Sequence, residues 1–80
     1  MFHYVYILQS LSAADAFYVG QTEDLFSRLT KHNGGDVPHT SKHRPWRIKT
    51  AIAFADGNRA LAFEKYLKTA SGRAFAKKRL

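Results

Sequence analysis

With 80 residues the chain has room for one small domain, and a hydrophobic content of 45% with 14% aromatic residues argues against disorder. The absence of cysteine excludes disulfides, thiolate metal sites and a cysteine nucleophile, and it favours a reducing, cytoplasmic location. Lys and Arg outnumber Asp and Glu by 13 to 6, so the net charge of +7 indicates a polyanionic partner, although a basic solubilising surface has the same composition.

Two strands are expected first along the chain. Residues 3–9, HYVYILQ, are β-branched and aromatic with a two-residue alternation, which places Val5 and Ile7 on one face and Tyr6 and Leu8 on the other. After the small-residue turn SLSAAD, residues 16–20, AFYVG, form a second strand that pairs with the first as a hairpin. The N-terminus lacks the basic and long apolar regions of a signal peptide, and no apolar run approaches the roughly 18 residues of a membrane span, so no membrane partner is expected.

A helix is predicted after the second strand, with Thr22 as its N-cap and Asn33-Gly34-Gly35 as its end. Its apolar stripe consists of Leu25, Phe26 and Leu29. Glycine, proline and polar residues dominate from 34 to 45, which indicates a long surface loop.

The third strand is predicted over residues 46–54, WRIKTAIAF, with every second residue from Trp46 to Phe54 on one continuous face and a central position in the sheet. The turn ADGN leads into a helix over 58–70, and Gly72 separates it from a short basic helix over 73–79. The order ββαβαα predicts a single α+β domain over residues 1–80, in which a small, three-stranded, mainly antiparallel sheet is flanked by helices.

Five side chains have the chemistry of a phosphodiesterase site. Arg28 and His32 are four residues apart on the first predicted helix, so they lie on nearly the same side. Glu64 lies at the margin of the apolar stripe of the later helix. With Tyr6 and Tyr18 on paired strands, these residues supply a cation for a phosphate, a carboxylate for a hard divalent metal, and hydroxyls for proton transfer.

Each of these side chains also has a simpler interpretation. A tyrosine in a strand is commonly half-buried packing, and an arginine on a helix is commonly solvated. The histidine near the helix C-terminus can complement the helix dipole. Glu64 has Lys68 four residues later, a spacing typical of a surface ion pair. None of the five is specific when taken alone.

The ordered set resembles the GIY-YIG nuclease family over almost the whole chain, and more closely its small single-domain members of the UPF0213 type. YVY at 4–6 ends on Tyr6, which falls on the tyrosine that closes the first motif, and YVG at 18–20 matches the second motif with Val for Ile. Arg28 and His32 fall where the family keeps an arginine and a His or Tyr, and NRALAFEKYLK at 58–68 looks like its metal-binding helix, with Glu64 as the ligand.

The resemblance implies hydrolysis of a phosphodiester with one divalent ion, Mg²⁺ or Mn²⁺, held by Glu64. It implies Tyr18 as a base or water-orienting group and Tyr6 as its partner, with exchangeable roles, and Arg28 as charge for the transition state. Gly20 is expected to permit a close approach of backbone or substrate. All five side chains are expected to converge on one concave face.

Tyr4 and Val5 stand where Gly and Ile often occur in the first motif, and the chain departs from the family pattern at two further positions. Gln21 follows the glycine where many relatives carry lysine, and Ala76 stands near the position where larger relatives have a stabilising asparagine. Family nucleases usually attach this module to separate DNA-binding domains, so a partner protein is expected to supply target choice.

Two basic segments, 39–49 and 73–79, are expected to bind nucleic acid. Their candidate binding residues are Lys42, Arg44, Arg47, Lys49, Arg73, Lys77 and Lys78. Trp46 is expected in the core rather than as a base-stacking platform.

The sequence thus predicts a metal-dependent endonuclease that acts on DNA with some preference for DNA structure. The alternative is a nucleic-acid-binding module that keeps the fold without turnover. A third interpretation is a subunit whose basic faces dock an acidic protein, and salt-sensitive binding to nucleic acid would separate it from the other two.

Overall fold

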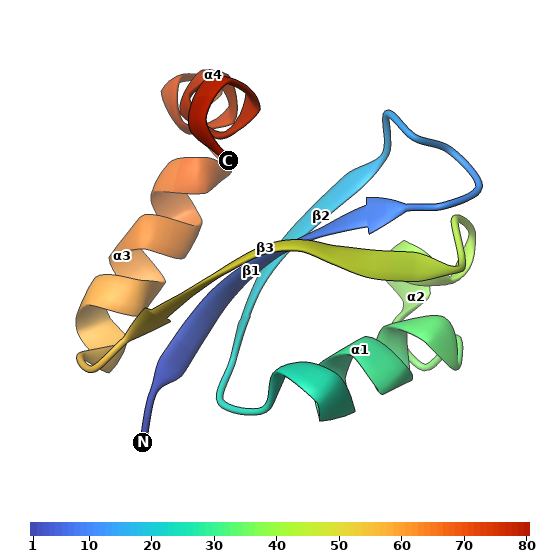
Figure 1. Ribbon diagram of the computed structural model, residues 1–80, viewed down its shortest axis with the longest axis horizontal. Helices are drawn as coiled ribbons and strands as arrows, with labels where there is room; N and C mark the ends of the chain where they lie inside the picture. The colour runs from blue at the N-terminus through green and yellow to red at the C-terminus, as the bar shows by residue number, and fades with distance from the viewer.

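The computed structural model describes residues 1–80, which form a three-stranded antiparallel sheet with helices on both faces (Figure 1). The strands are β1 (His3–Ser10), β2 (Phe17–Thr22) and β3 (Trp46–Phe54). The helices are α1 (Leu25–Asn33), α2 (Pro38–Ser41), α3 (Gly57–Leu67) and α4 (Ala70–Arg79). The predicted α+β class and its three-stranded antiparallel sheet are confirmed. None of the helices has the length and apolar character needed to cross a membrane.

The central strand is β1, with β2 on one side and β3 on the other, so the prediction that the third strand is central is wrong. Tyr6 lies opposite Gly20 of β2 and opposite Ala51 of β3. The four consecutive residues from Val5 to Leu8 are all buried, whereas Arg47 and Ala51 on β3 are exposed. A continuous apolar run is typical of a strand that is covered on both faces, and an alternating pattern is typical of a strand with one open face.

A bulge in β3 changes which face its side chains occupy. In the β1–β3 pairing Lys49 is the extra residue, because the ladder passes over it at an irregularity in register. Trp46 and Ile48 therefore pack with Tyr6 on the α1 side of the sheet, while Phe54 packs on the α3 side. One inserted residue inverts the two-residue alternation of a strand. The prediction of one continuous face from Trp46 to Phe54 is accordingly wrong.

Helix α1 is capped by Asp24 rather than by the predicted Thr22. The Asp24 carboxylate accepts a hydrogen bond of 3.1 Å from the backbone N–H of Ser27. The Thr22 hydroxyl instead accepts from the N–H of Asp24 and shapes the turn before the helix. An aspartate suits the positive end of a helix dipole better than a neutral hydroxyl does. Phe26 is 77% exposed, so the apolar stripe of α1 reduces to its two leucines.

The segment predicted as a long loop contains the short helix α2, which begins at Pro38, a residue favoured at the first helical position. Trp46 is 4% exposed, which confirms its expected place in the core, and its indole N–H donates to the carbonyl of Thr40 at 2.8 Å. The side chain of Asn33 also bridges the backbone of Trp46, accepting from its N–H and donating to its carbonyl. The hydrogen bond to Thr40 holds α2 against the sheet despite its polar, proline-containing sequence, and those of Asn33 fix the end of α1 to β3.

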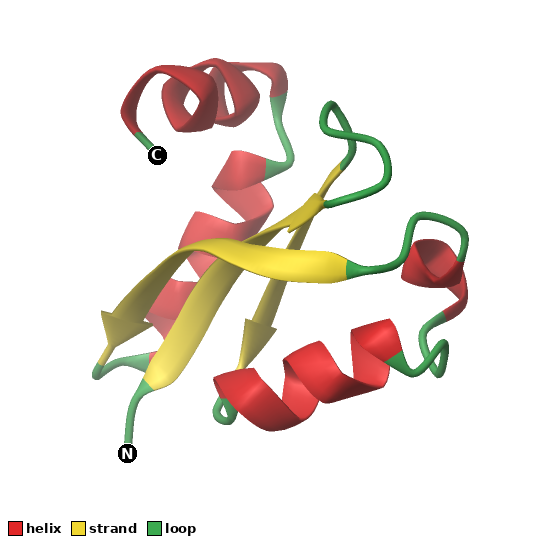
Figure 2. Ribbon diagram, turned by 45° about the vertical axis from the view of Figure 1, so that its right-hand side comes forward, coloured by secondary structure: helices red, strands yellow, loops and turns green.

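Helices α3 and α4 cover the other face of the sheet (Figure 2). Asp56 caps α3 and Thr69 caps α4, where the threonine hydroxyl accepts from the N–H of Gly72 at 3.0 Å. A Cβ at Gly72 would collide with the backbone carbonyl of Tyr66. The glycine thus lies inside the first turn of α4 and permits its close packing on α3, rather than separating the two helices as predicted.

Candidate active site

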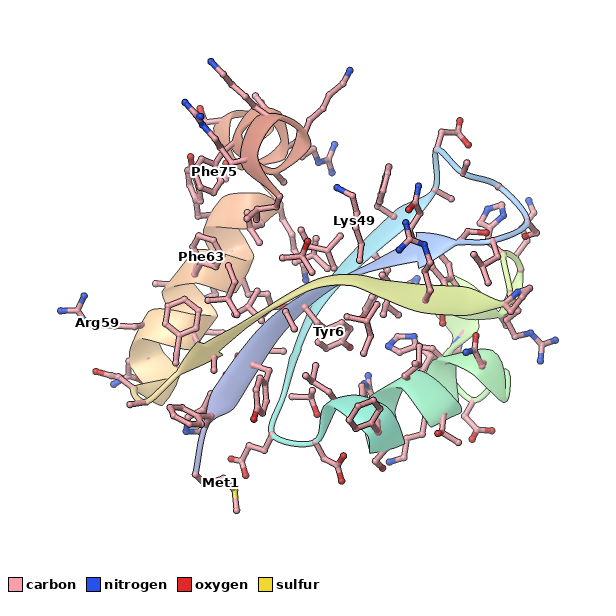
Figure 3. All side chains as sticks on the ribbon, in the orientation of Figure 1. Met1, Tyr6, Lys49, Arg59, Phe63 and Phe75 are labelled. Carbon is pink, nitrogen blue, oxygen red and sulfur yellow. The ribbon has the colours of Figure 1, made fainter.

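Four of the predicted site residues come together on the face of the sheet that α1 covers. The rings of Tyr6 on β1 and Tyr18 on β2 have centroids 6.4 Å apart. The ring of His32, in the last turn of α1, lies 6.0 Å from Tyr6 and 4.8 Å from Tyr18. Figure 3 shows Tyr6 extending from the sheet toward α1. Arg28 lies one turn before His32 on the same helix.

Gly20 makes this arrangement sterically possible. It lies opposite Tyr6 in the β1–β2 ladder, on the same face. A Cβ built on Gly20 would lie 2.6 Å from Cζ of Tyr6 and 3.1 Å from Cε2 of Tyr18. The Tyr6 ring therefore crosses β2 where only a glycine leaves room for it.

A chain of buried hydrogen bonds runs from the sheet through α1 to α2. The hydroxyl of Tyr6 lies 3.0 Å from Nε2 of His32, and Nδ1 of the same ring lies 2.8 Å from the hydroxyl of Thr40. Tyr6 is 2% exposed, and His32 and Thr40 are completely buried. No buried side-chain nitrogen or oxygen lacks a hydrogen-bond partner. Sequence reasoning missed Thr40 because it lies in the segment predicted as a surface loop.

Arg28 sets the electrostatics of this cluster. Its hydrogen bond to Tyr6 raises the pKa of the guanidinium, with smaller contributions from Tyr18, so Arg28 stays charged at any physiological pH. Burial raises the pKa of Tyr6, and the hydrogen bond from Arg28 opposes that shift only in part. Burial, and then the positive charge of Arg28, lowers the pKa of His32. At neutral pH the site holds a neutral phenol and a neutral imidazole beside a permanent cation.

Glu64 approaches the tyrosines from a different element. Helix α3 packs on the opposite face of the sheet from α1, and the convergence of all five side chains on one concave face stays a prediction. Yet the negative charge of Glu64 contributes to the raised pKa of Tyr6, which places its carboxylate within electrostatic range of that hydroxyl. Its side chain is 17% exposed, and its Oε2 lies 2.9 Å from Nζ of Lys68. The ion pair of the simpler interpretation is therefore present.

Glu64 is the carboxylate that the family pattern assigns to a metal ion, and two further carboxylates, Glu23 and Asp24, line the polar cavity between β2 and α1. No three His, Cys, Asp or Glu side chains cluster closely enough to form a metal cage. A single, partly exposed carboxylate fits a hard divalent ion such as Mg²⁺, which keeps several waters and takes further oxygens from a phosphate. Binding would require Glu64 to exchange Lys68 for the ion, which an exposed ammonium permits at little cost.

A polar cavity of about 320 Å³ opens at the junction of β2 and α1, beside this cluster. Polar side chains line all of it, among them Gln21, Arg28 and Lys31. Gln21 stands here in place of the lysine expected from the family pattern, so the cavity carries one cation fewer than that pattern implies.

The candidate nucleic-acid-binding residues fall into two groups. Those on α4, namely Arg73, Lys77 and Lys78, are exposed, and Lys42 is exposed after α2. The others make contacts within the fold. Arg44 donates to the backbone carbonyls of Ser41 and Asn33, Arg47 donates to Gln9, and the ammonium of Lys49 lies 5.5 Å from the ring centroid of Phe17.

Known proteins are similar to this chain in sequence. Residues 2–79 match the model of the GIY-YIG catalytic domain. A UPF0213 protein of Lacticaseibacillus paracasei is 37% identical over 67 residues, which cover 82% of this chain and 73% of that protein. The structure-specific endonuclease subunit SLX1 of Podospora anserina is 38% identical over 66 residues, which cover 75% of this chain but only 19% of that protein.

A solved structure agrees with these sequence relatives. The solution NMR structure of a UPF0213 protein from Bacillus halodurans matches with a TM-score of 0.57 and 32% identity, and the match covers 96% of this chain and 81% of that one. The chain therefore belongs to the GIY-YIG family, as a small protein of the UPF0213 type.

Proposed function

We propose that this chain is an endonuclease that hydrolyses phosphodiester bonds in DNA with the help of one divalent ion, Mg²⁺ or Mn²⁺, bound at Glu64. The observation that carries the proposal is the buried hydrogen bond between Tyr6 and His32 beside Arg28. A phenol and an imidazole held together next to a fixed cation suit proton transfer at a phosphate, and packing alone does not require them.

Tyr6 acts as a proton carrier in this proposal. Because its pKa is raised, the phenol stays protonated at neutral pH and cannot serve as a base by itself. The neutral Nε2 of His32, 3.0 Å away, can take the phenolic proton while Tyr6 takes a proton from the attacking water. This geometry favours Tyr6 in the role that the sequence interpretation gave first to Tyr18. Tyr18, which packs against the same imidazole, is left to orient the water.

Arg28 stabilises the charge that builds up on phosphorus-bound oxygens in the transition state. Its guanidinium lies close enough to the tyrosines for Tyr6 to raise its pKa, so a permanent positive charge is already at the site when the phosphate arrives. A bound divalent ion would neutralise phosphate charge and stabilise the leaving oxygen. Glu64 would hold that ion.

DNA is the proposed substrate because the surface is strongly basic and because relatives include structure-specific endonuclease subunits. The exposed cations on α4 and after α2 supply phosphate contacts without base recognition. Such contacts fit a preference for DNA structure over sequence. Those relatives are endonuclease subunits by name, which supports a partner protein that contributes target choice.

The Glu64–Lys68 ion pair favours a second candidate, a module that binds nucleic acid without cleaving it. In that case Glu64 serves only α3, and its contribution to stability is on the order of a few tenths of a kcal/mol. The two candidate functions predict different results when the Glu64 carboxylate is removed.

The experiment compares wild type, Glu64→Gln and Arg28→Ala in nicking of plasmid DNA, branched DNA and RNA, with Mg²⁺, Mn²⁺ or chelator. Glu64→Gln should lower cleavage by orders of magnitude, while binding in chelator holds steady or tightens because a charge near the phosphate is gone. Asp15→Asn, which removes an exposed carboxylate in the β1–β2 turn, is the matched control and should cleave normally. Absence of cleavage by wild type on every substrate would favour the binding module, and cleavage that survives both substitutions would exclude this site.

A further inference from the structure

Thr40 is a buried polar residue at the far end of the hydrogen-bond chain from Tyr6. It is completely buried, although its helix has only four residues and one face in solvent. Its carbonyl accepts from the indole of Trp46 at 2.8 Å, and its N–H donates to the carbonyl of Val37 at 3.1 Å. Its backbone is thus fixed from two sides, which fixes its hydroxyl against Nδ1 of His32.

The hydroxyl of Thr40 has two neighbours and one proton. It lies 3.2 Å from the carbonyl oxygen of Val37, which can only accept, and 2.8 Å from Nδ1 of His32. When the hydroxyl donates to the carbonyl, its oxygen must accept from Nδ1–H. The other ring nitrogen, Nε2, then carries a free lone pair that points at the hydroxyl of Tyr6.

We propose that Thr40 is a positioning residue that holds His32 in the Nδ1-protonated tautomer, so that Nε2 is always free to receive the proton of Tyr6. The catalytic consequence rests on the proposed nuclease function. The tautomer itself is a property of the folded protein and is measured without substrate.

The tautomer decides the direction of proton transfer. With Nε2 bare, the attacking water loses a proton to the Tyr6 oxygen as the Tyr6 proton moves to Nε2, and the water oxygen forms its bond to phosphorus as the bond to the leaving oxygen breaks. His32 becomes an imidazolium whose Nδ1–H remains bonded to Thr40. The leaving oxygen takes its proton from solvent. With the opposite tautomer Nε2 already carries a proton, and this route is closed.

The position of Thr40, and with it the tautomer of His32, also depends on packing in the core. Trp46 is buried on the α1 side of the sheet, and its indole holds the carbonyl of the residue that orients the histidine.

The test replaces the hydroxyl while keeping the shape. Thr40→Val removes the acceptor at nearly constant volume, Thr40→Ser restores it, and Thr30→Val is the matched control, since it removes a threonine hydroxyl bonded within α1. The readout is the pair of ring-nitrogen chemical shifts of His32 in ¹⁵N-labelled protein at neutral pH. Nicking of plasmid DNA is measured on the same samples.

Wild type, Thr40→Ser and Thr30→Val should show a protonated Nδ1 and a bare Nε2, and Thr40→Val should show a mixture or the reverse. Cleavage by Thr40→Val should fall about 10–100-fold, the usual cost of losing a partner that orients a functional histidine, and Thr40→Ser should recover it. If wild-type His32 is protonated on Nε2, or if Thr40→Val leaves the tautomer unchanged, the proposal is overturned. The wild-type spectrum decides this even if Thr40→Val does not fold.

The two proposals fail in different ways. If Thr40→Val changes the tautomer as expected but wild type cleaves no nucleic acid, the positioning role of Thr40 stands and the nuclease function falls. If wild type cleaves and Thr40→Val cleaves equally well with an unchanged tautomer, the nuclease stands and the role of Thr40 falls.

Discussion

Replacement of Gly20 by alanine should damage both the fold and the site through a single contact. The added Cβ would lie 2.6 Å from Cζ of Tyr6, far inside van der Waals contact, and 3.1 Å from Cε2 of Tyr18. Tyr6 is buried between the sheet and α1, so it cannot move away without losing its hydrogen bond to His32. The substitution therefore couples steric strain to the loss of the proposed proton carrier.

The magnitude follows from two opposing effects. Overpacking a buried site costs about 1–3 kcal/mol. Replacing glycine by alanine recovers about 0.4–1 kcal/mol by restricting the unfolded chain, because Gly20 has no positive φ. A net loss of about 1–2 kcal/mol is expected, which lowers the melting temperature by about 4–8 °C per kcal/mol in a domain of this size.

Urea unfolding of Gly20→Ala, alone and in a Tyr6→Leu background, measures this contact directly. If the clash with Tyr6 is the cause, most of the stability lost in Gly20→Ala should be regained in the Tyr6→Leu background, because leucine is shorter than tyrosine. The coupling energy between the two substitutions should then be about 1 kcal/mol or more. Gly57→Ala is the matched control, because its Cβ would meet only the movable side chain of His3, and it should be neutral or stabilising. A Gly20→Ala protein as stable as wild type, or a cost that is the same in both backgrounds, would refute the steric argument.

Two further outcomes are expected. Since the pKa of His32 is lowered in the folded protein, the unfolded chain binds a proton first as the pH falls below about 6.5. The free energy of unfolding should therefore decline from that pH toward the folded pKa and then level off. An NMR titration of the His32 ring, with urea unfolding at the same pH values, checks this. Binding to DNA should weaken steeply with salt, and Lys78→Ala should reduce the slope of log affinity against log salt by about 1 on any DNA sequence. Arg44→Ala should also lower the stability of the fold, because its side chain donates hydrogen bonds to two backbone carbonyls. Binding titrations at several salt concentrations and thermal melts separate the two effects.

The residues that carry the candidate site were accessible from the sequence because they obey local rules. Tyr6, Tyr18 and Gly20 lie on an apolar hairpin whose alternation puts them on one face, and Arg28 and His32 lie one helical turn apart. Such relations depend on spacing within an element or across one short turn. The match to the GIY-YIG domain over residues 2–79 confirms the family to which they point.

The errors arise where spacing stops being informative. The bulge at Lys49 inverts half of β3 without any mark in the alternation, because both halves remain apolar at every second position. The order β2-β1-β3 depends on which edge of the hairpin the later strand joins, a choice made by packing between distant segments. The sequence did carry one signal for the central strand. The unbroken apolar run of β1 indicates a strand that is buried on both faces.

Thr40 shows why a site is harder to predict than a fold. Nothing in the local pattern around Pro38 distinguishes a buried threonine from a solvated one, and its importance comes from two partners, His32 eight residues before it and Trp46 six residues after it. A surface loop in this place would leave Nδ1 of His32 exposed to water, and the tautomer would then be set by solvent. Because α2 covers the imidazole, core packing determines which ring nitrogen of His32 is protonated. Trp46→Ala should therefore alter the ring-nitrogen chemical shifts of His32 under conditions in which the protein is still folded.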